Sequence, residues 1–119
     1  MKLTNLFVIA SFVILVQNSL AANELTPGQT IAVKAKACSY MVKFAKSEGV
    51  QGYDLQTCLR TAELQYAETH WHTKKLVISY YENSIPDLMN SDQWLSCEFQ
   101  ADSATSDFKS EDSYCSIEG

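Results

Sequence analysis

The sequence is poor in the residue patterns from which phosphate-binding and nucleophilic sites are built. It has only four glycines and two prolines in 119 residues, and the glycines form no phosphate-binding loop. It has no G-x-S-x-G motif, and no two cysteines have the C-x-x-C spacing of zinc or redox sites. Asn-x-Ser/Thr sequons are also missing, which slightly favours a bacterial over a eukaryotic exported protein. These absences argue against a nucleotide-binding enzyme, a serine hydrolase and a dithiol oxidoreductase.

The longest apolar run lies near the start of the chain and is too short to span a bilayer comfortably. Lys2 supplies a positive charge, residues 6–16 form the run, and small residues follow at Ala21 and Ala22. This is the layout of a secretory signal peptide, whereas a membrane-spanning helix needs roughly 20 apolar residues. We therefore expect residues 1–22 to be a signal peptide that is removed. Residues 23–119 are then one small periplasmic or secreted domain with no membrane attachment.

All four cysteines lie beyond this segment, at Cys38, Cys58, Cys97 and Cys115. An even number of cysteines in a short exported chain predicts two disulfides and no free thiol. Such cross-links stabilise a domain of about 100 residues, whose core is small. Pairing of neighbours, Cys38 with Cys58 and Cys97 with Cys115, is favoured because consecutive elements tend to be adjacent. Crossed pairing between the two halves stays open.

The charge of the chain is acidic and unevenly distributed. The net charge is −5, and from Glu82 onward nine acidic residues face a single basic one, Lys109. An acidic surface repels nucleic acid and anionic membranes, so neither is expected as a partner. It suits a basic partner protein. The alternative is a solvated acidic surface that only keeps a small domain soluble.

Two helices are predicted in the first half of the chain. Thr26 begins the first with a capping-box pattern, and Gly49 is a plausible stop. Asp54 caps the second, whose apolar residues recur at helical spacing to about Ala67 and allow an extension to Trp71.

The first predicted helix carries more apolar surface than one core contact needs. Its main stripe comprises Ile31, Ala35, Cys38, Val42 and Ala45. A second stripe includes Tyr40 and Phe44. So wide an apolar arc indicates a helix that is sandwiched between layers or partly covered by another subunit. A homodimer through Tyr40 and Phe44 is therefore one expectation.

The second half of the chain alternates with the period of strands. Residues 76–81, 93–101 and 113–117 are predicted strands, separated by a loop at 83–92 and a polar segment at 102–112. Helices followed by strands predict an α+β domain. We expect two N-terminal helices packed on one face of a small antiparallel three-stranded meander, cross-linked by disulfides.

A binding surface is predicted on the strand face opposite Cys97. Trp94 lies on that face, and with Tyr81 and Tyr114 it would form an aromatic patch bordered by acidic residues. Tyr and Trp are typical of the residues that dominate binding energy in protein interfaces. The predicted partner-binding residues are Trp94, Tyr81, Tyr114, Glu98 and Asp92, with Asp102, Asp107 and Asp112 adding to the negative field. If a further element covers this face, the patch is core instead.

One group of residues could form a metal or catalytic site: Glu68, His70 and His72. On a strand the three side chains would share a face and could bind zinc; on a helix they would diverge. The preceding pattern is helical, so no metal, cofactor or catalytic residue is predicted. The expected function is an exported protein-binding domain, an inhibitor or immunity protein that neutralises a basic enzyme or toxin. The alternative is a small exported hydrolase or metal-binding protein that uses His70 and His72.

Overall fold

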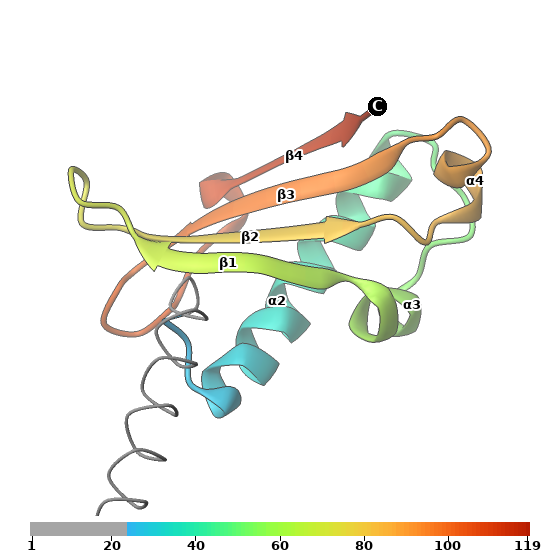
Figure 1. Ribbon diagram of the computed structural model, residues 1–119. Helices are drawn as coiled ribbons and strands as arrows, with labels where there is room; N and C mark the ends of the chain where they lie inside the picture. Colours follow the sequence, from blue (N-terminus) through green and yellow to red (C-terminus); the bar gives the residue numbers. More distant parts are fainter. Residues whose placement is uncertain (1–23) are drawn as a thin grey trace, which may run out of the picture.

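A long helix, α2 (Pro27–Ser47), lies against one face of a four-stranded antiparallel sheet (Figure 1). The computed structural model describes residues 24–119, so the predicted signal peptide lies outside the described residues. The fold is α+β, as predicted, but the sheet has four strands rather than three. The other elements, in chain order, are α3 (Leu55–Thr61), β1 (Glu63–Thr69), β2 (Leu76–Glu82), α4 (Pro86–Met89), β3 (Trp94–Ala101), a 3-10 turn (Ser110–Asp112) and β4 (Ser113–Glu118).

Helix α2 begins and ends where the sequence predicts. The Thr26 hydroxyl accepts a hydrogen bond from the Gln29 N–H at 3.2 Å, and the Gln29 side chain accepts from the Thr26 N–H at 2.9 Å. This reciprocal capping box satisfies backbone donors that the first helical turn leaves free. After Ser47 the chain turns at Gly49, whose φ of +76° is a left-handed conformation that favours glycine.

The buried stripe of α2 matches the predicted main stripe only in part. Ile31 is 73% exposed and Ala35 is also exposed. The core positions of α2 are Val33, Ala37, Cys38, Met41 and Ala45. Cys38 and Ala45 are buried as predicted, but the prediction was wrong at Ile31 and Ala35. Two apolar stripes lie side by side on this helix, and only the sheet determines which residues are covered.

The sheet is a simple meander in the order β1-β2-β3-β4. Its inner face contributes residues that are fully buried against α2, among them Ile78, Tyr80, Leu95 and Phe99. These positions alternate along β2 and β3, as expected for strands with one face in a core. The neighbouring residues on each strand therefore point to the opposite face.

The first strand lies where the sequence predicted the second helix to continue. Helix α3 stops at Thr61, and β1 starts at Glu63. The pairing of β1 with β2 is irregular between Leu64 and Tyr66, which is a β-bulge. The bulge leaves Leu64 and Ala67 on the core side, three residues apart, which is also helical spacing. A bulged strand therefore resembled a helix in the sequence pattern.

The short helix α4 occupies a segment that was predicted as loop. Pro86 stands at its first turn, and the buried side chains of Ile85 and Leu88 fix it to the core. Proline suits the start of a helix because its missing N–H would have no partner there. A single turn is too short to produce a helical pattern in the sequence.

The two disulfides confirm the neighbour pairing. Cys38 joins Cys58 and links α2 to α3, while Cys97 joins Cys115 across β3 and β4. No free cysteine remains among the residues that the structure describes. Each disulfide therefore lies within one layer of the fold, and the contact between the sheet and α2 is not covalent.

Candidate protein-binding face

The sheet face that points away from α2 is the open face, and residues 24–119 place no helix over it (Figure 1). Alternation along the four strands defines its members. They are Glu63, Gln65, Tyr66 and Glu68 of β1, Val77, Ser79 and Tyr81 of β2, Trp94, Ser96, Glu98 and Gln100 of β3, and Tyr114, Ser116 and Glu118 of β4. The predicted aromatic patch is thus on a surface that no described element covers.

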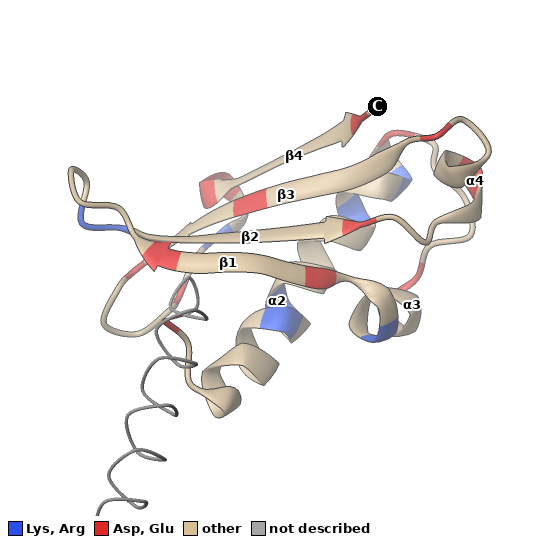
Figure 2. Cartoon of the chain, in the orientation of Figure 1, with Lys and Arg blue, Asp and Glu red and all other residues tan. Residues whose placement is uncertain are grey.

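The open face is acidic and has no cation of its own. Four carboxylates stand on it, those of Glu63, Glu68, Glu98 and Glu118, whereas strands β1 to β4 contain no lysine or arginine. Figure 2 shows the basic residues instead on the helices, in the turn between β1 and β2 and in the segment before β4. The basic residues of the described chain therefore lie off the strands that form the open face.

One row of side chains runs across all four strands of this face. Tyr66, Ser79, Glu98 and Tyr114 are successive cross-strand neighbours. Because Ser79 is small, the Tyr66 ring extends over it, and the Tyr66 hydroxyl donates a hydrogen bond to Glu98 Oε1 at 3.1 Å. Glu98 is half-buried and lies in this row between Tyr66, which donates to it, and Tyr114, its partner on β4.

A second tyrosine–glutamate pair joins β1 to β2. The Tyr81 hydroxyl donates to Glu63 Oε2 at 2.6 Å. This bond raises the pKa of Tyr81. The pKa of Tyr66 is raised by burial first and then by the hydrogen bond to Glu98. Both hydroxyls therefore stay protonated at neutral pH and act as donors that hold the two carboxylates in fixed positions.

Two hollows lie on either side of the Tyr66–Glu98 pair on the open face. One, of about 310 Å³, is lined by Tyr66, Glu68, His70, Thr73, Val77, Glu98 and Gln100. The other, of about 290 Å³, lies between β1 and β4, and its lining includes Tyr66, Glu98, Tyr114 and Glu118. Tyr66 and Glu98 line both hollows, so the pair stands between them.

The structure brings together five of the predicted partner-binding residues, although Asp92 only at the rim. Trp94 lies opposite Glu118 and two residues along β3 from Ser96, which faces Tyr81. Tyr114 lies opposite Glu98. Trp94 is 40% exposed and Tyr114 is 71% exposed, so both offer ring surface to a partner. Asp92 lies in the turn that leads into β3, with a φ of +54°.

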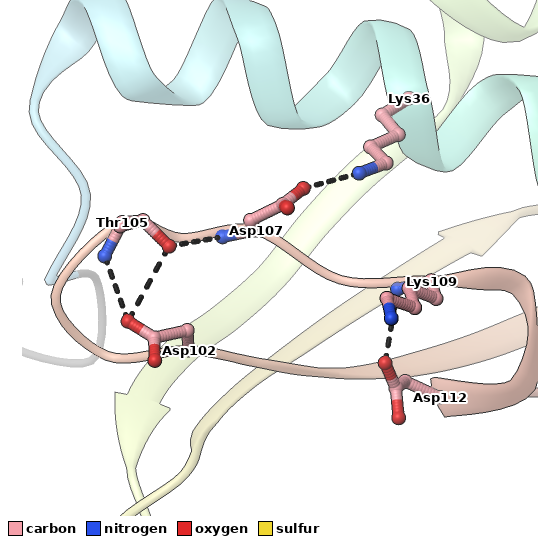
Figure 3. A network of polar contacts seen from close by, with 6 residues as sticks. All are labelled: Lys36, Asp102, Thr105, Asp107, Lys109 and Asp112. Atoms are coloured by element: carbon pink, nitrogen blue, oxygen red, sulfur yellow. Dashed lines mark hydrogen bonds and ion pairs between the residues drawn. The ribbon is translucent and has the colours of Figure 1, made fainter.

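Three predicted aspartates lie away from this patch, in the segment between β3 and β4 (Figure 3). Asp102 accepts hydrogen bonds from the backbone of Ala104 and Thr105, which lower its pKa. Asp107 pairs with Lys36 of α2, and this bond lowers the pKa of the carboxyl. Asp112 accepts from the Lys109 N–H at 2.9 Å. These carboxylates hold their own segment, so any effect on a partner at Trp94 acts through long-range charge.

The two histidines lie in the tight turn between β1 and β2 rather than on a helix. His70 Nδ1 accepts hydrogen bonds from the N–H groups of His72 and Thr73, at 3.2 and 3.3 Å. The rings of His70 and His72 flank Trp71, which is 77% exposed. Within residues 24–119 no group of three or more His, Cys, Asp or Glu side chains could hold a metal ion. His70 stabilises the turn, because its Nδ1 atom accepts these two backbone hydrogen bonds.

The second apolar stripe of α2 packs inward for the most part. Tyr40 contacts the rings of Phe99 and Phe108, with centroids 6.3 and 5.8 Å apart, and both Tyr40 and Phe44 are half-buried. Their remaining surface lines a groove beside β4. The predicted homodimer through these residues stays a prediction.

Tyr66, Glu63 and Glu68 were not predicted as members of the open face, because the second helix was expected to continue to about Ala67 or Trp71. The alternation of Glu63 and Glu68 with apolar neighbours was a usable signal, but the bulge at Leu64 and Tyr66 interrupts it.

No helix in the described part of the chain is long and apolar enough to cross a membrane. Comparisons of the chain with protein-family models, curated proteins and solved structures give no match.

Proposed function

We propose that the protein is an exported protein-binding domain whose open face binds a basic protein, as an inhibitor or immunity protein does. The observation that carries this proposal is the composition of the open face, where four aromatic rings and four carboxylates occur with no lysine or arginine. The two disulfides fit an oxidising compartment such as the periplasm or the extracellular space.

The rigidity of the face supports binding rather than mere solubility. A solvated acidic surface needs only flexible side chains, but here Glu98 and Glu63 each accept a hydrogen bond from a tyrosine hydroxyl of another strand. Groups that are fixed before binding lose less conformational entropy when a partner arrives. The acidic side chains of this face are thus prepared for charged contacts.

The hollow beside Tyr66 has the chemistry for a lysine or arginine side chain. Its walls hold the carboxylates of Glu68 and Glu98, and none of its lining residues is a lysine or arginine. Glu98 uses only Oε1 in its bond to Tyr66, so Oε2 is available to a cation. A tyrosine ring next to paired carboxylates favours a guanidinium, which stacks on aromatic faces and binds carboxylates in a bidentate manner.

Trp94 supplies apolar contact area at the other end of the open face, at the start of β3. Its exposed ring surface would become buried on binding, whereas the acidic rim would accelerate association with a basic partner. Trp94→Ala should therefore mainly speed dissociation. Charge reversal at Asp102, Asp107 and Asp112 should mainly slow association, because these residues lie outside the contact.

The proposal is tested by affinity capture from the periplasmic or secreted fraction of the source organism, at low and high salt. The double variant Glu68→Gln/Glu98→Gln removes two charges from the open face. A matched control, Glu48→Gln/Glu111→Gln, removes two exposed charges elsewhere. We expect a basic protein that the native chain and the control capture, that salt releases, and that the open-face variant loses. Equal capture by both variants would place the binding site elsewhere.

A further inference from the structure

The two edges of the sheet differ in how they are protected. The β1 edge is covered near its end, because the Glu24 N–H donates to the Ala67 carbonyl at 2.7 Å and the Glu24 carboxylate accepts from the Thr69 N–H. The bulge also disrupts this edge. The β4 edge has no bulge, proline or lysine, and no strand of the described chain pairs with its outer side. Unprotected edges are templates for pairing with another strand.

The backbone groups on the outer side of β4 are identified by the disulfide. The Cα atoms of Cys97 and Cys115 are 4.1 Å apart, a separation typical of a non-hydrogen-bonded antiparallel pair. Residues of such a pair direct their N–H and C=O groups away from each other. By alternation Ile117 does the same. Cys115 and Ile117 thus present free donors and acceptors to an incoming antiparallel strand.

The side chains of β4 complement a second copy of the same strand. We propose that β4 pairs antiparallel with β4 of a second copy, with Ser116 on the two-fold axis. In this register Cys115 faces Ile117 of the second copy, which matches the outward backbone groups. Tyr114 then faces Glu118 of the second copy on the open face, and the symmetry makes this contact twice.

The sheet itself uses the same contact between adjacent strands, since Tyr81 lies opposite Glu63 and donates a hydrogen bond to it. A second tyrosine–glutamate bond, from Tyr66 to Glu98, reaches across β2. Tyr114 is 71% exposed, and its hydroxyl has no such partner in the described chain. A register with Cys115 on the axis would place Glu118 opposite Asp112, which is a repulsive pair. Ser116 is therefore the favoured centre.

A groove beside β4 would accommodate the inward-pointing side chains of the added strand. It has a volume of about 340 Å³ and is lined by Tyr40, Phe44, Ser113 and Cys115 among others. In the proposed register the Ile117 side chain of the second copy points toward this groove. The half-exposed rings of Tyr40 and Phe44 would then gain apolar cover, in agreement with the homodimer that the sequence predicts through the same two residues.

The dimer should respond to salt in the opposite way to the proposed basic partner. Each copy carries a net charge of −5, so two copies repel each other, and salt screens the repulsion. Sedimentation velocity of the protein alone should show a monomer–dimer equilibrium that shifts toward dimer as salt rises. Because this assay contains no second protein, its result is independent of whether the open face binds a basic partner.

The register is tested with Ser116→Cys under mild oxidation. A two-fold axis at residue 116 brings the two introduced thiols together, and Cα separations of 4.4–6.8 Å permit a disulfide. We expect a covalent dimer whose peptide map shows a 116–116 link. The matched control Ser96→Cys, on the same face but on β3, should stay monomeric. Cross-linking of both variants to the same extent, or of neither, overturns the proposal.

Edge pairing itself is tested at Ile117. Ile117→Pro removes an N–H that points away from β3, so the bonds within the sheet remain, whereas Ile117→Ala removes side-chain surface and keeps the N–H. The alanine variant should dimerise more weakly than the native chain, and the proline variant should lose dimerisation. If Ile117→Pro fails to fold, as circular dichroism would show, the Ser116→Cys result decides alone. A folded proline variant that still dimerises overturns the proposal.

Discussion

Phe108 anchors the polar segment between β3 and β4, and its removal should be one of the most damaging single changes in the domain. Its ring is 2% exposed and packs against Phe99 at 4.9 Å and Tyr40 at 5.8 Å between centroids. Phe108→Ala should lower the free energy of unfolding by about 4 kcal/mol, because core Phe→Ala changes cost about 3–5 kcal/mol. Whole domains are stable by only about 5–15 kcal/mol.

The measurement is urea unfolding followed by tryptophan fluorescence. With a slope of about 1.5 kcal/mol/M, a loss of about 4 kcal/mol lowers the midpoint by about 2.7 M. The control is Asp107→Asn, which breaks the exposed ion pair to Lys36 in the same segment and should barely move the midpoint. The reasoning is refuted if Asp107→Asn lowers the midpoint as much as Phe108→Ala does.

Two further outcomes are expected. In a stepwise reduction followed by alkylation and mass spectrometry, the Cys97–Cys115 disulfide should open before Cys38–Cys58, because Cys115 is half-buried whereas Cys38 and Cys58 are both fully buried. Earlier labelling of Cys38 would contradict this. Burial raises the pKa of Tyr80 to about 12 and leaves its hydroxyl without a partner in the described chain. Stability should therefore fall as pH rises from about 10 toward 12, since the unfolded chain releases this proton first. Tyr80→Phe should reduce that loss in unfolding experiments at these pH values without destabilising the protein at pH 7. A Tyr80→Phe variant with an unchanged alkaline transition would show that another group is responsible.

Local signals predicted most of the elements whose ends are marked by side-chain chemistry. Thr26 and Asp54 cap α2 and α3 as expected, since capping depends on residues only three positions apart. The strands β2, β3 and β4 were predicted from alternation, which requires only that one face be buried. The neighbour pairing of cysteines also depends on proximity along the chain.

The failures occurred where distant contacts determine the outcome. The bulge at Leu64 and Tyr66 exists because β2 offers a partner strand, and without that partner the spacing is helical. Ile31 is exposed because the sheet covers the other stripe of α2. Phe108 stands in a polar segment, and its burial follows from a gap between α2 and β3 that no local pattern reveals. Trp94 lies on the strand face opposite Cys97, as alternation predicts, but the glutamates that β1 adds to this face were not predicted.

The order of the cysteines along the chain has a consequence for how the protein matures. Both disulfides join consecutive cysteines, which are 20 and 18 residues apart. A chain that enters an oxidising compartment with its N-terminus first can close each bond as soon as the next thiol emerges, and every such closure is native. For a chain that closes its bonds in this order, a thiol oxidase would be sufficient, with no isomerase to rearrange wrong pairs.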